Sequence, residues 1–275
     1  MARNDTTASI LARCFGGAGG AANARGRRRD ASRASPPELA SLSFHLSLIE
    51  YAYDAATAGA ATATAPDPRV AIAEVFDLPW DPKKCIATLW TSRDDPGVAF
   101  LAFRGTLNLF EWAIDLHCAH TAYPKFGDGC FVHSGFHGAY ESVRDDIHRA
   151  IAKHGILRTF ISGHSLGGAM AVLAAADLGA VAVAEVVTYG APRVGNVAWA
   201  HVFQQRTEGV RVLQVRDEGD AVCLVPLPSM PDLNPFDDDP EYTHVGEWLY
   251  FRSAERSLAG CHSVANYRAF GDGVI

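Results

Sequence analysis

Hydrophobic positions from residue 36 onward follow first a helical and then a strand-like spacing. Apolar residues recur at helical spacing behind a proline-containing helix start at 35–38: Leu39, Leu42, Leu46, Ile49 and Tyr53. Short β-branched and aromatic runs predict strands over 70–76, 85–90, 98–103, 159–162, 181–188, 210–215 and 248–251. Helices are predicted between them over 139–153, 166–178 and 197–206, and the alanine-rich tract 55–65 predicts a loop. This alternation indicates an α/β protein built on a sheet.

The first 35 residues differ from the rest of the 275-residue chain. They hold seven arginines against Asp5 and Asp30, a net charge of +5 in a chain of −7, so residues 36–275 carry −12. Without a hydrophobic period, this Arg-, Ala- and Gly-rich arm is predicted to be disordered. Its arginine-rich, acid-poor composition is typical of an organelle transit peptide, and a low-complexity tail is the alternative. Residues 36–275 are predicted to form a single domain.

Composition excludes several classes of function. An acidic body argues against a nucleic-acid partner, which needs a basic face. No apolar run reaches the roughly 18 residues of a membrane span. The six cysteines form no C-x-x-C pair, which argues against zinc-ribbon and thioredoxin sites. The N-terminus lacks the apolar core of a signal peptide, so we expect reduced thiols and an intracellular location, either cytoplasmic or, with a transit peptide, in a chloroplast or mitochondrion.

The stretch 159–169, TFISGHSLGGA, carries the strongest chemical signal in the chain. A β-branched and aromatic run ends in G-x-S-x-G and passes directly into a helical run. Strand, tight turn and helix together form the nucleophile elbow that exposes a serine hydroxyl. Ser165 is therefore the predicted nucleophile, and the backbone N–H of Leu166 is a predicted donor to the oxyanion.

Five segments resemble the class 3, fungal-type triacylglycerol lipase family. They are FRGT at 103–106, EWAIDL at 111–116, VHSGF at 132–136 followed by Ala139 and Tyr140, GHSLGGAMA at 163–171, and YGAPRVGN at 189–196. They occur in the family's order, and the resemblance covers roughly residues 70–270. It implies an α/β-hydrolase-like fold, with a central, mostly parallel mixed sheet flanked by helices. It also implies a carboxylic ester hydrolase that needs no cofactor.

The resemblance also implies the rest of a catalytic triad. Asp220, in the segment that resembles the family's Asp-x-Val…Pro, is the predicted orienting carboxylate, and Asp217 is the alternative on the same loop. His262 matches the family's C-terminal histidine and is the predicted base, with His244 as the alternative. Thr106, by resemblance, supplies the second oxyanion donor.

The interval after Thr106 corresponds to the lid of such lipases. Its apolar residues Leu107, Leu109, Phe110 and Trp112 suit a short amphipathic cover that contacts a lipid surface transiently. A helical turn packed permanently on the core is the alternative.

The spacing of the candidate ligands argues against a zinc site and against a calcium site. The histidines and cysteines between 117 and 137 match no zinc pattern, and the acidic residues between 232 and 241 lack the spacing of a calcium-binding loop. No metal site is predicted.

The predicted function is hydrolysis of lipid acyl esters through an acyl-enzyme, as in a triacylglycerol lipase, with a lipid or other ester as substrate. A phospholipase A1 or galactolipase of the same fold is an alternative. A non-catalytic lipase-like signalling module is the alternative from a different class, although such modules usually lose triad residues that are all present here.

Overall fold

A large mixed sheet forms the centre of the protein. The structure is a computed structural model that describes residues 28–30, 36–58, 66–78, 81–106, 120–226 and 241–275. Within these ranges eight strands pair in the order β1 (Arg28–Asp30), β12 (Glu247–Phe251), β10 (Arg211–Asp217), β8 (Val183–Tyr189), β7 (Arg158–His164), β4 (Val98–Phe103), β3 (Asp81–Ser92) and β2 (Val70–Leu78). From β1 to β4 every pair is parallel, while β4, β3 and β2 pair antiparallel. The predicted mostly parallel mixed sheet is confirmed.

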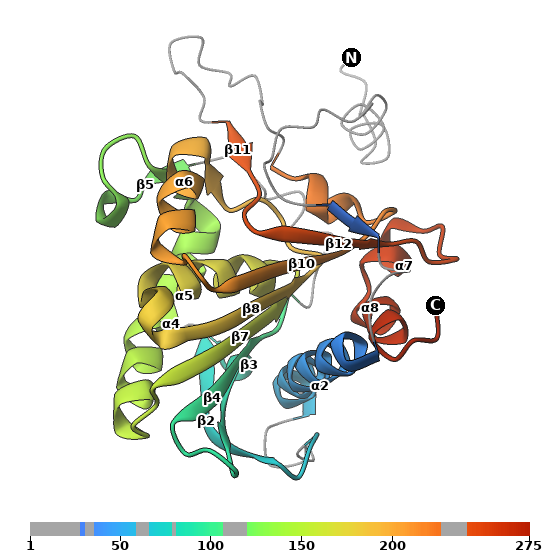
Figure 1. Cartoon of the computed structure of the whole chain (residues 1–275), viewed down its shortest axis with the longest axis horizontal. Helices are drawn as coiled ribbons and strands as arrows, with labels where there is room; N and C mark the ends of the chain where they lie inside the picture. The colour runs from blue at the N-terminus through green and yellow to red at the C-terminus, as the bar shows by residue number, and fades with distance from the viewer. Residues whose placement is uncertain (1–27, 31–35, 59–65, 79–80, 107–119, 227–240) are drawn as a thin grey trace, which may run out of the picture.

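Helices cover both faces of this sheet (Figure 1). One face carries α2 (Pro36–Ala58) and α8 (Val264–Gly271), and the other carries α4 (Ser134–Lys153), α5 (Leu166–Ala182) and α6 (Val197–Arg206). Each face has its own hydrophobic core. On the α2 face Tyr51 meets Trp90 edge-on with ring centroids 4.7 Å apart, and Phe251 stacks on Phe270 at 4.4 Å. The two cores hold the carboxyl ends of the parallel strands, where the site lies, from both sides.

A second, smaller sheet was not predicted from the sequence. Among the described residues it contains β11 (Tyr242–Thr243), β9 (Gly195–Asn196), β6 (Phe131–His133) and β5 (His120–Ala122), all antiparallel. Strands of two or three residues are too short to show a period-two pattern. Asn196 in β9 ties this sheet to α6. Its Oδ1 accepts from the N–H of Phe131 in β6 at 3.1 Å and from the N–H of Trp199 in α6 at 3.0 Å.

Several segment boundaries differ from the sequence prediction, among them the ends of α2 and α5. Helix α2 continues to Ala58, so the predicted loop over 55–65 is wrong for its first four residues, where Ala55 and Ala56 are buried. Residues 181 and 182 belong to the end of α5, which is kinked at Gly179, and β8 begins only at Val183. Burial of Ala55 and Ala56 outweighs the weak local preference at the end of α2, whereas Val181 at the end of α5 is 91% exposed.

The predicted N-terminal arm is described over three residues only. Arg28–Asp30 form β1, parallel to β12 at one edge of the large sheet. The rest of the arm lies outside the described residues, so both the disordered arm and the single domain over 36–275 stay predictions.

Two expectations about the chain's environment touch the described residues. No helix among them is long and apolar enough to cross a membrane. Four cysteines fall within the described ranges, namely Cys85, Cys130, Cys223 and Cys261, and each is a buried free thiol.

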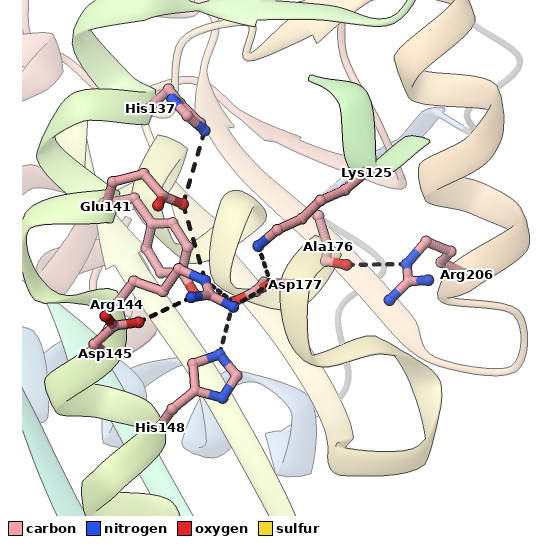
Figure 2. Close-up of polar contacts among 10 residues, drawn as sticks. Lys125, His137, Glu141, Arg144, Asp145, His148, Ala176, Asp177 and Arg206 are labelled. Atoms are coloured by element: carbon pink, nitrogen blue, oxygen red, sulfur yellow. Dashed lines mark hydrogen bonds and ion pairs between the residues drawn. The ribbon is translucent and has the colours of Figure 1, made fainter. Parts of the chain in front are cut away.

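A buried carboxylate joins α4 to α5 away from the elbow (Figure 2). The side chain of Asp177 on α5 is 5% exposed. It accepts from Lys125 Nζ at 2.8 Å, Arg144 Nε at 2.8 Å, His148 Nε2 at 2.7 Å and the Tyr140 hydroxyl at 3.0 Å. Burial alone raises the pKa of Asp177, but hydrogen bonds from Lys125, His148 and Arg144 outweigh it and hold that pKa below the usual range.

We expect Asp177→Asn to lower the free energy of unfolding by about 3 kcal/mol near neutral pH, because it leaves two cationic side chains without their buried partner. Since the pKa of Asp177 is lowered in the folded protein, its stabilising effect is present above the unfolded-state pKa of about 3.9 and is lost as the pH falls below it. Urea unfolding at about pH 7 and about pH 3 should therefore show a smaller difference from wild type at the lower pH.

The matched control is Asp145→Asn. Asp145 also contacts Arg144, at 2.9 Å, but its side chain is 81% exposed. This variant should change the free energy of unfolding by less than about 1 kcal/mol. Equal losses in the two variants would contradict the role assigned to Asp177.

Candidate active site

The predicted nucleophile lies on a strained turn between a strand and a helix. Strand β7 ends at His164, helix α5 begins at Leu166, and Ser165 between them has φ 59°. It is the one non-glycine residue with positive φ among the described residues. The Ser165 N–H donates to the Tyr189 carbonyl at 2.9 Å, which ties the turn to the end of β8. Backbone strain of this kind, held by the surrounding structure, is characteristic of functional sites.

Glycine is required around this turn for steric reasons. A Cβ at Gly163 would overlap the Gly167 carbonyl, and a Cβ at Gly167 would overlap the carbonyl of Phe103 at the end of β4. The strand, the helix and the loop after β4 can therefore approach one another only because both positions lack a side chain. The G-x-S-x-G spacing is thus a packing requirement of the turn.

The predicted base and carboxylate form a buried pair. His262 ends α7 (Leu258–His262), and Asp220 precedes the short helix η3 (Ala221–Leu224). The His262 Nδ1 lies 2.9 and 2.8 Å from the two carboxylate oxygens of Asp220. The two residues are 3% and 1% exposed, so water hardly screens the contact. The Val222 N–H donates to Asp220 Oδ1 at 2.9 Å, and the Tyr267 hydroxyl donates to Oδ2 at 2.5 Å.

Ser165 and His262 both lie next to the end of β8. Ser165 bonds the Tyr189 carbonyl, and a Cβ built on the next residue, Gly190, would lie 3.1 Å from His262 Cε1 and 2.7 Å from Asp220 Oδ2. Ser165 Oγ and His262 Nε2 are both buried and have no hydrogen-bond partner among the described residues. The structure thus brings the three predicted residues around one dipeptide, with the two reactive atoms uncommitted.

The alternative carboxylate and base are engaged elsewhere. Asp217 accepts from the Ser253 hydroxyl, from Asn266 Nδ2 at 2.8 Å and from the Gly219 N–H at 2.9 Å, so it joins β12 to α8. His244 is buried, and its Nε2 donates to the Cys223 carbonyl at 2.8 Å. None of these hydrogen bonds joins Asp217 or His244 to Asp220 or His262.

The loop after β4 reaches the serine. A Cβ on Gly105 would lie 2.8 Å from Ser165 Cβ, so Thr106, the next residue, stands beside the elbow. The buried Arg104 side chain donates to the carbonyls of Cys85 and Gly105, which holds the loop to β3. The Leu166 N–H is at the start of α5, where helix N–H groups and the helix dipole favour negative charge.

The sequence analysis did not identify two tyrosines and one histidine that lie near the site. Tyr267 donates to Asp220, as described above. Tyr53 on α2 accepts from the Gly105 N–H at 2.9 Å and contacts His164 Nδ1 at 2.9 Å, and His164 Nε2 lies 2.8 Å from the His262 carbonyl. Tyr53 appeared in the sequence only as one apolar position of a helical pattern, and His164 only as a neighbour of the serine.

The protonation states of His164 and Tyr53 follow from their burial. Burial, and next the neighbouring His262, lowers the pKa of His164 to about 3, and burial raises the pKa of Tyr53 to about 12. Both groups are therefore neutral at ordinary pH. The His262 carbonyl can only accept, so His164 carries its proton on Nε2 and receives the Tyr53 O–H at Nδ1. The hydrogen bonds of Tyr53 and His164 thus link the loop after β4 to the backbone of His262.

The predicted lid falls outside the described residues. Leu107, Leu109, Phe110 and Trp112 lie in the range 107–119, as does the whole 111–116 segment. The lid and its alternative both stay predictions.

Comparison with known proteins agrees with this arrangement. Residues 100–230 match the family model of lipase (class 3). The secreted mono- and diacylglycerol lipase A of Penicillium cyclopium is 34% identical over 170 residues, which cover 60% of this chain and 51% of that protein. A chloroplastic phospholipase A(1) of Arabidopsis thaliana is 27% identical over 222 residues, covering 64% of this chain and 49% of that protein. The chain therefore spans about half the length of the curated relatives it matches.

Solved structures agree on the fold. The Rhizomucor miehei triacylglyceride lipase superposes with a TM-score of 0.64 at 21% identity and covers 85% of this chain and 94% of its own. The fold is therefore that of the α/β-hydrolase-type fungal lipases. The matched region 100–230, which includes the loop after β4, the elbow and Asp220, is similar in sequence to the class 3 lipase family.

Proposed function

We propose that the protein is a serine ester hydrolase that cleaves acyl esters of lipids through an acyl-enzyme intermediate. The observation that carries this proposal is the buried pairing of His262 with Asp220 behind an elbow serine. The Asp220 carboxylate accepts from His262 Nδ1, so the imidazole carries its proton there and presents a lone pair at Nε2. That tautomer is the one that can remove the proton from Ser165 Oγ.

The reaction then follows from the positions of the donors. Ser165 Oγ attacks the ester carbonyl carbon while His262 Nε2 takes its proton. The Leu166 N–H and Thr106, from the two sides of the elbow, stabilise the developing oxyanion. His262 returns the proton to the leaving alcohol, and a water molecule, activated by the same nitrogen, releases the fatty acid. No cofactor takes part in these steps.

Covalent labelling tests the nucleophile and the fold in one experiment. The intact protein is treated with a fluorophosphonate probe and digested, and the adduct is located by mass spectrometry. We expect a single adduct on Ser165, blocked by prior incubation with a p-nitrophenyl ester. A folded protein that stays unlabelled would overturn the proposal and indicate the non-catalytic module instead.

We propose neutral acylglycerols as the substrate class. Residues 36–275 carry a net charge of −12, which disfavours approach to an anionic lipid surface. Because some relatives are phospholipases A1, a second candidate activity is cleavage of phospholipid or galactolipid acyl esters. Fatty-acid release from emulsions of diacylglycerol and triacylglycerol should exceed release from galactolipid and phosphatidylcholine vesicles, and should exceed release from vesicles of an anionic phospholipid by the largest factor. The opposite ranking would favour the second candidate.

We expect Tyr53→Phe to lower kcat for a p-nitrophenyl ester by about tenfold or more with little change in KM. The substitution removes the hydroxyl that bonds both the Gly105 N–H and His164, so the oxyanion loop loses one of its anchors. Steady-state kinetics with circular dichroism as a folding check would measure this. Tyr51→Phe is the control, because Tyr51 lies on the same helix but packs on Trp90. Equal effects of the two variants would contradict the positioning role of Tyr53.

A further inference from the structure

A small cavity lies behind the loop that carries Asp220. Its walls come from β10, β12, η3 and the residue His244, and they include Val215, Cys223 and Ala191. Its volume is about 10 Å³, counted as the space available to the centre of a water-sized sphere. That is about the size at which a buried site holds a single water molecule.

Three polar atoms of the cavity's lining residues are buried and have no hydrogen-bond partner within the described ranges. They are Arg216 Nε on β10, Trp248 Nε1 on β12 and His244 Nδ1. Buried polar atoms in folded proteins almost always have a partner, either protein or ordered water. The three residues that carry these atoms line one cavity of this size, which points to a common bound partner.

The donor and acceptor roles of these atoms are set by their chemistry. Arginine Nε and tryptophan Nε1 can only donate a hydrogen bond. The Nε2 atom of His244 donates to the Cys223 carbonyl, so this nitrogen carries the ring proton. Burial, and next Arg193, lowers the pKa of His244 to about 3, so the ring is neutral and its Nδ1 is an acceptor. The cavity thus presents two donors and one acceptor.

We propose that this cavity is a binding site for one water molecule that accepts from Arg216 Nε and Trp248 Nε1 and donates to His244 Nδ1. Water is the small ligand that can do both. An anion would face the lone pair of His244 Nδ1, and a cation would face two N–H donors beside the Arg216 guanidinium. The walls of Val215 and Ala191 leave no room for a larger polar molecule.

The site connects the sheet to the candidate catalytic loop. Arg216 and Trp248 lie on the neighbouring strands β10 and β12, and the guanidinium lies over the indole ring at 5.8 Å. From the water the connection continues through His244 to the carbonyl of Cys223 in η3, the short helix that follows Asp220. The bound water therefore serves as a structural part of the support beneath that loop, and this role does not depend on the proposed esterase activity.

Crystallography of the intact protein tests the site directly. At a resolution that orders buried waters, we expect one peak within about 2.7–3.2 Å of all three atoms. The peak should persist in crystals soaked in bromide, without anomalous signal. A bromide peak at this position would overturn the proposal in favour of an anion site, and a cavity without density would overturn it outright.

A variant pair tests the site in solution. Trp248→Phe keeps an aromatic ring beneath Arg216 and removes one donor. The number of long-lived buried waters, counted by ¹⁷O magnetic relaxation dispersion, should fall by one. Tyr250→Phe is the matched control, because Tyr250 lies on the same strand beneath the same guanidinium, at 5.5 Å, and does not line the cavity. Its count should equal that of wild type, and an unchanged count in Trp248→Phe would contradict the proposal. If Trp248→Phe does not fold, the crystallographic test of the wild-type protein stands by itself.

Discussion

Replacement of Ser165 by alanine is expected to lower kcat for a p-nitrophenyl ester by about 10⁴- to 10⁶-fold, the range seen when a serine hydrolase loses its nucleophile. The reason is that no other hydroxyl can take its place at the elbow. Ser165 alone occupies the turn at φ 59°, between the loop that carries Thr106 and the end of β8. Initial rates with a chromogenic ester would measure the loss.

The fold should survive this substitution. Ser165 Oγ makes no hydrogen bond to a described residue, so alanine removes no structural contact there. Thermal unfolding of the variant should match or slightly exceed that of wild type, because the buried unpaired hydroxyl is gone. Turnover close to wild type in a folded Ser165→Ala protein would show that the nucleophile lies elsewhere.

The second large effect is expected from Asp220→Asn, about 10⁴-fold in kcat. The amide that replaces the carboxylate has an N–H₂ group, which can bond His262 Nδ1 only when that nitrogen has lost its proton. The proton then lies on Nε2, and the imidazole can no longer accept the proton of Ser165. The amide oxygen can keep the bond from the Val222 N–H, while the N–H₂ group takes the place of Oδ2 and faces the Tyr267 hydroxyl, which must then accept in place of donating.

Asp217→Asn is the matched comparison for this experiment. Asp217 is the last residue of β10, three residues before Asp220, and is equally buried, but it bonds Ser253 and Asn266 in place of His262. We expect kcat to change by less than about tenfold, and the free energy of unfolding to fall by about 1–3 kcal/mol because a buried acceptor becomes a donor. A larger loss of kcat in Asp217→Asn than in Asp220→Asn would reverse the assignment of the carboxylate.

Local patterns were sufficient for every strand of the large sheet except β1, which lies in the arm predicted to be disordered. The strand 98–103 and the helix 197–206 were predicted at the bounds that the structure shows, because each is a run of apolar residues between clear turn signals. The elbow was equally visible, since strand, glycines, serine and helix are contiguous. The errors fall where long-range contacts decide, at the end of α2 and in the strands of the small sheet, which are only two or three residues long.

The carboxylate and the base that accompany the serine also depend on long-range contacts. From the residues themselves Asp217 and Asp220 were both acceptable, and so were His244 and His262, and only a resemblance to a family ranked them. Which carboxylate faces which imidazole depends on how the turn after β10 meets α7 and α8, segments that are about 40 residues apart in the chain. Tyr53 is farther still, 111 residues before His164, whose nitrogen it contacts.

The sequence by itself determined the fold class and predicted the nucleophile and its turn, because these depend on neighbouring residues whose spacing sets which way a strand or helix faces. Only the tertiary structure decided that Asp220 pairs with His262, that Tyr53 and His164 connect the loop after β4 to that histidine, and that Arg216, Trp248 and His244 line one small cavity. Each of these requires side chains from distant segments to meet within hydrogen-bond distance, and that meeting is a result of how the two cores pack on the sheet.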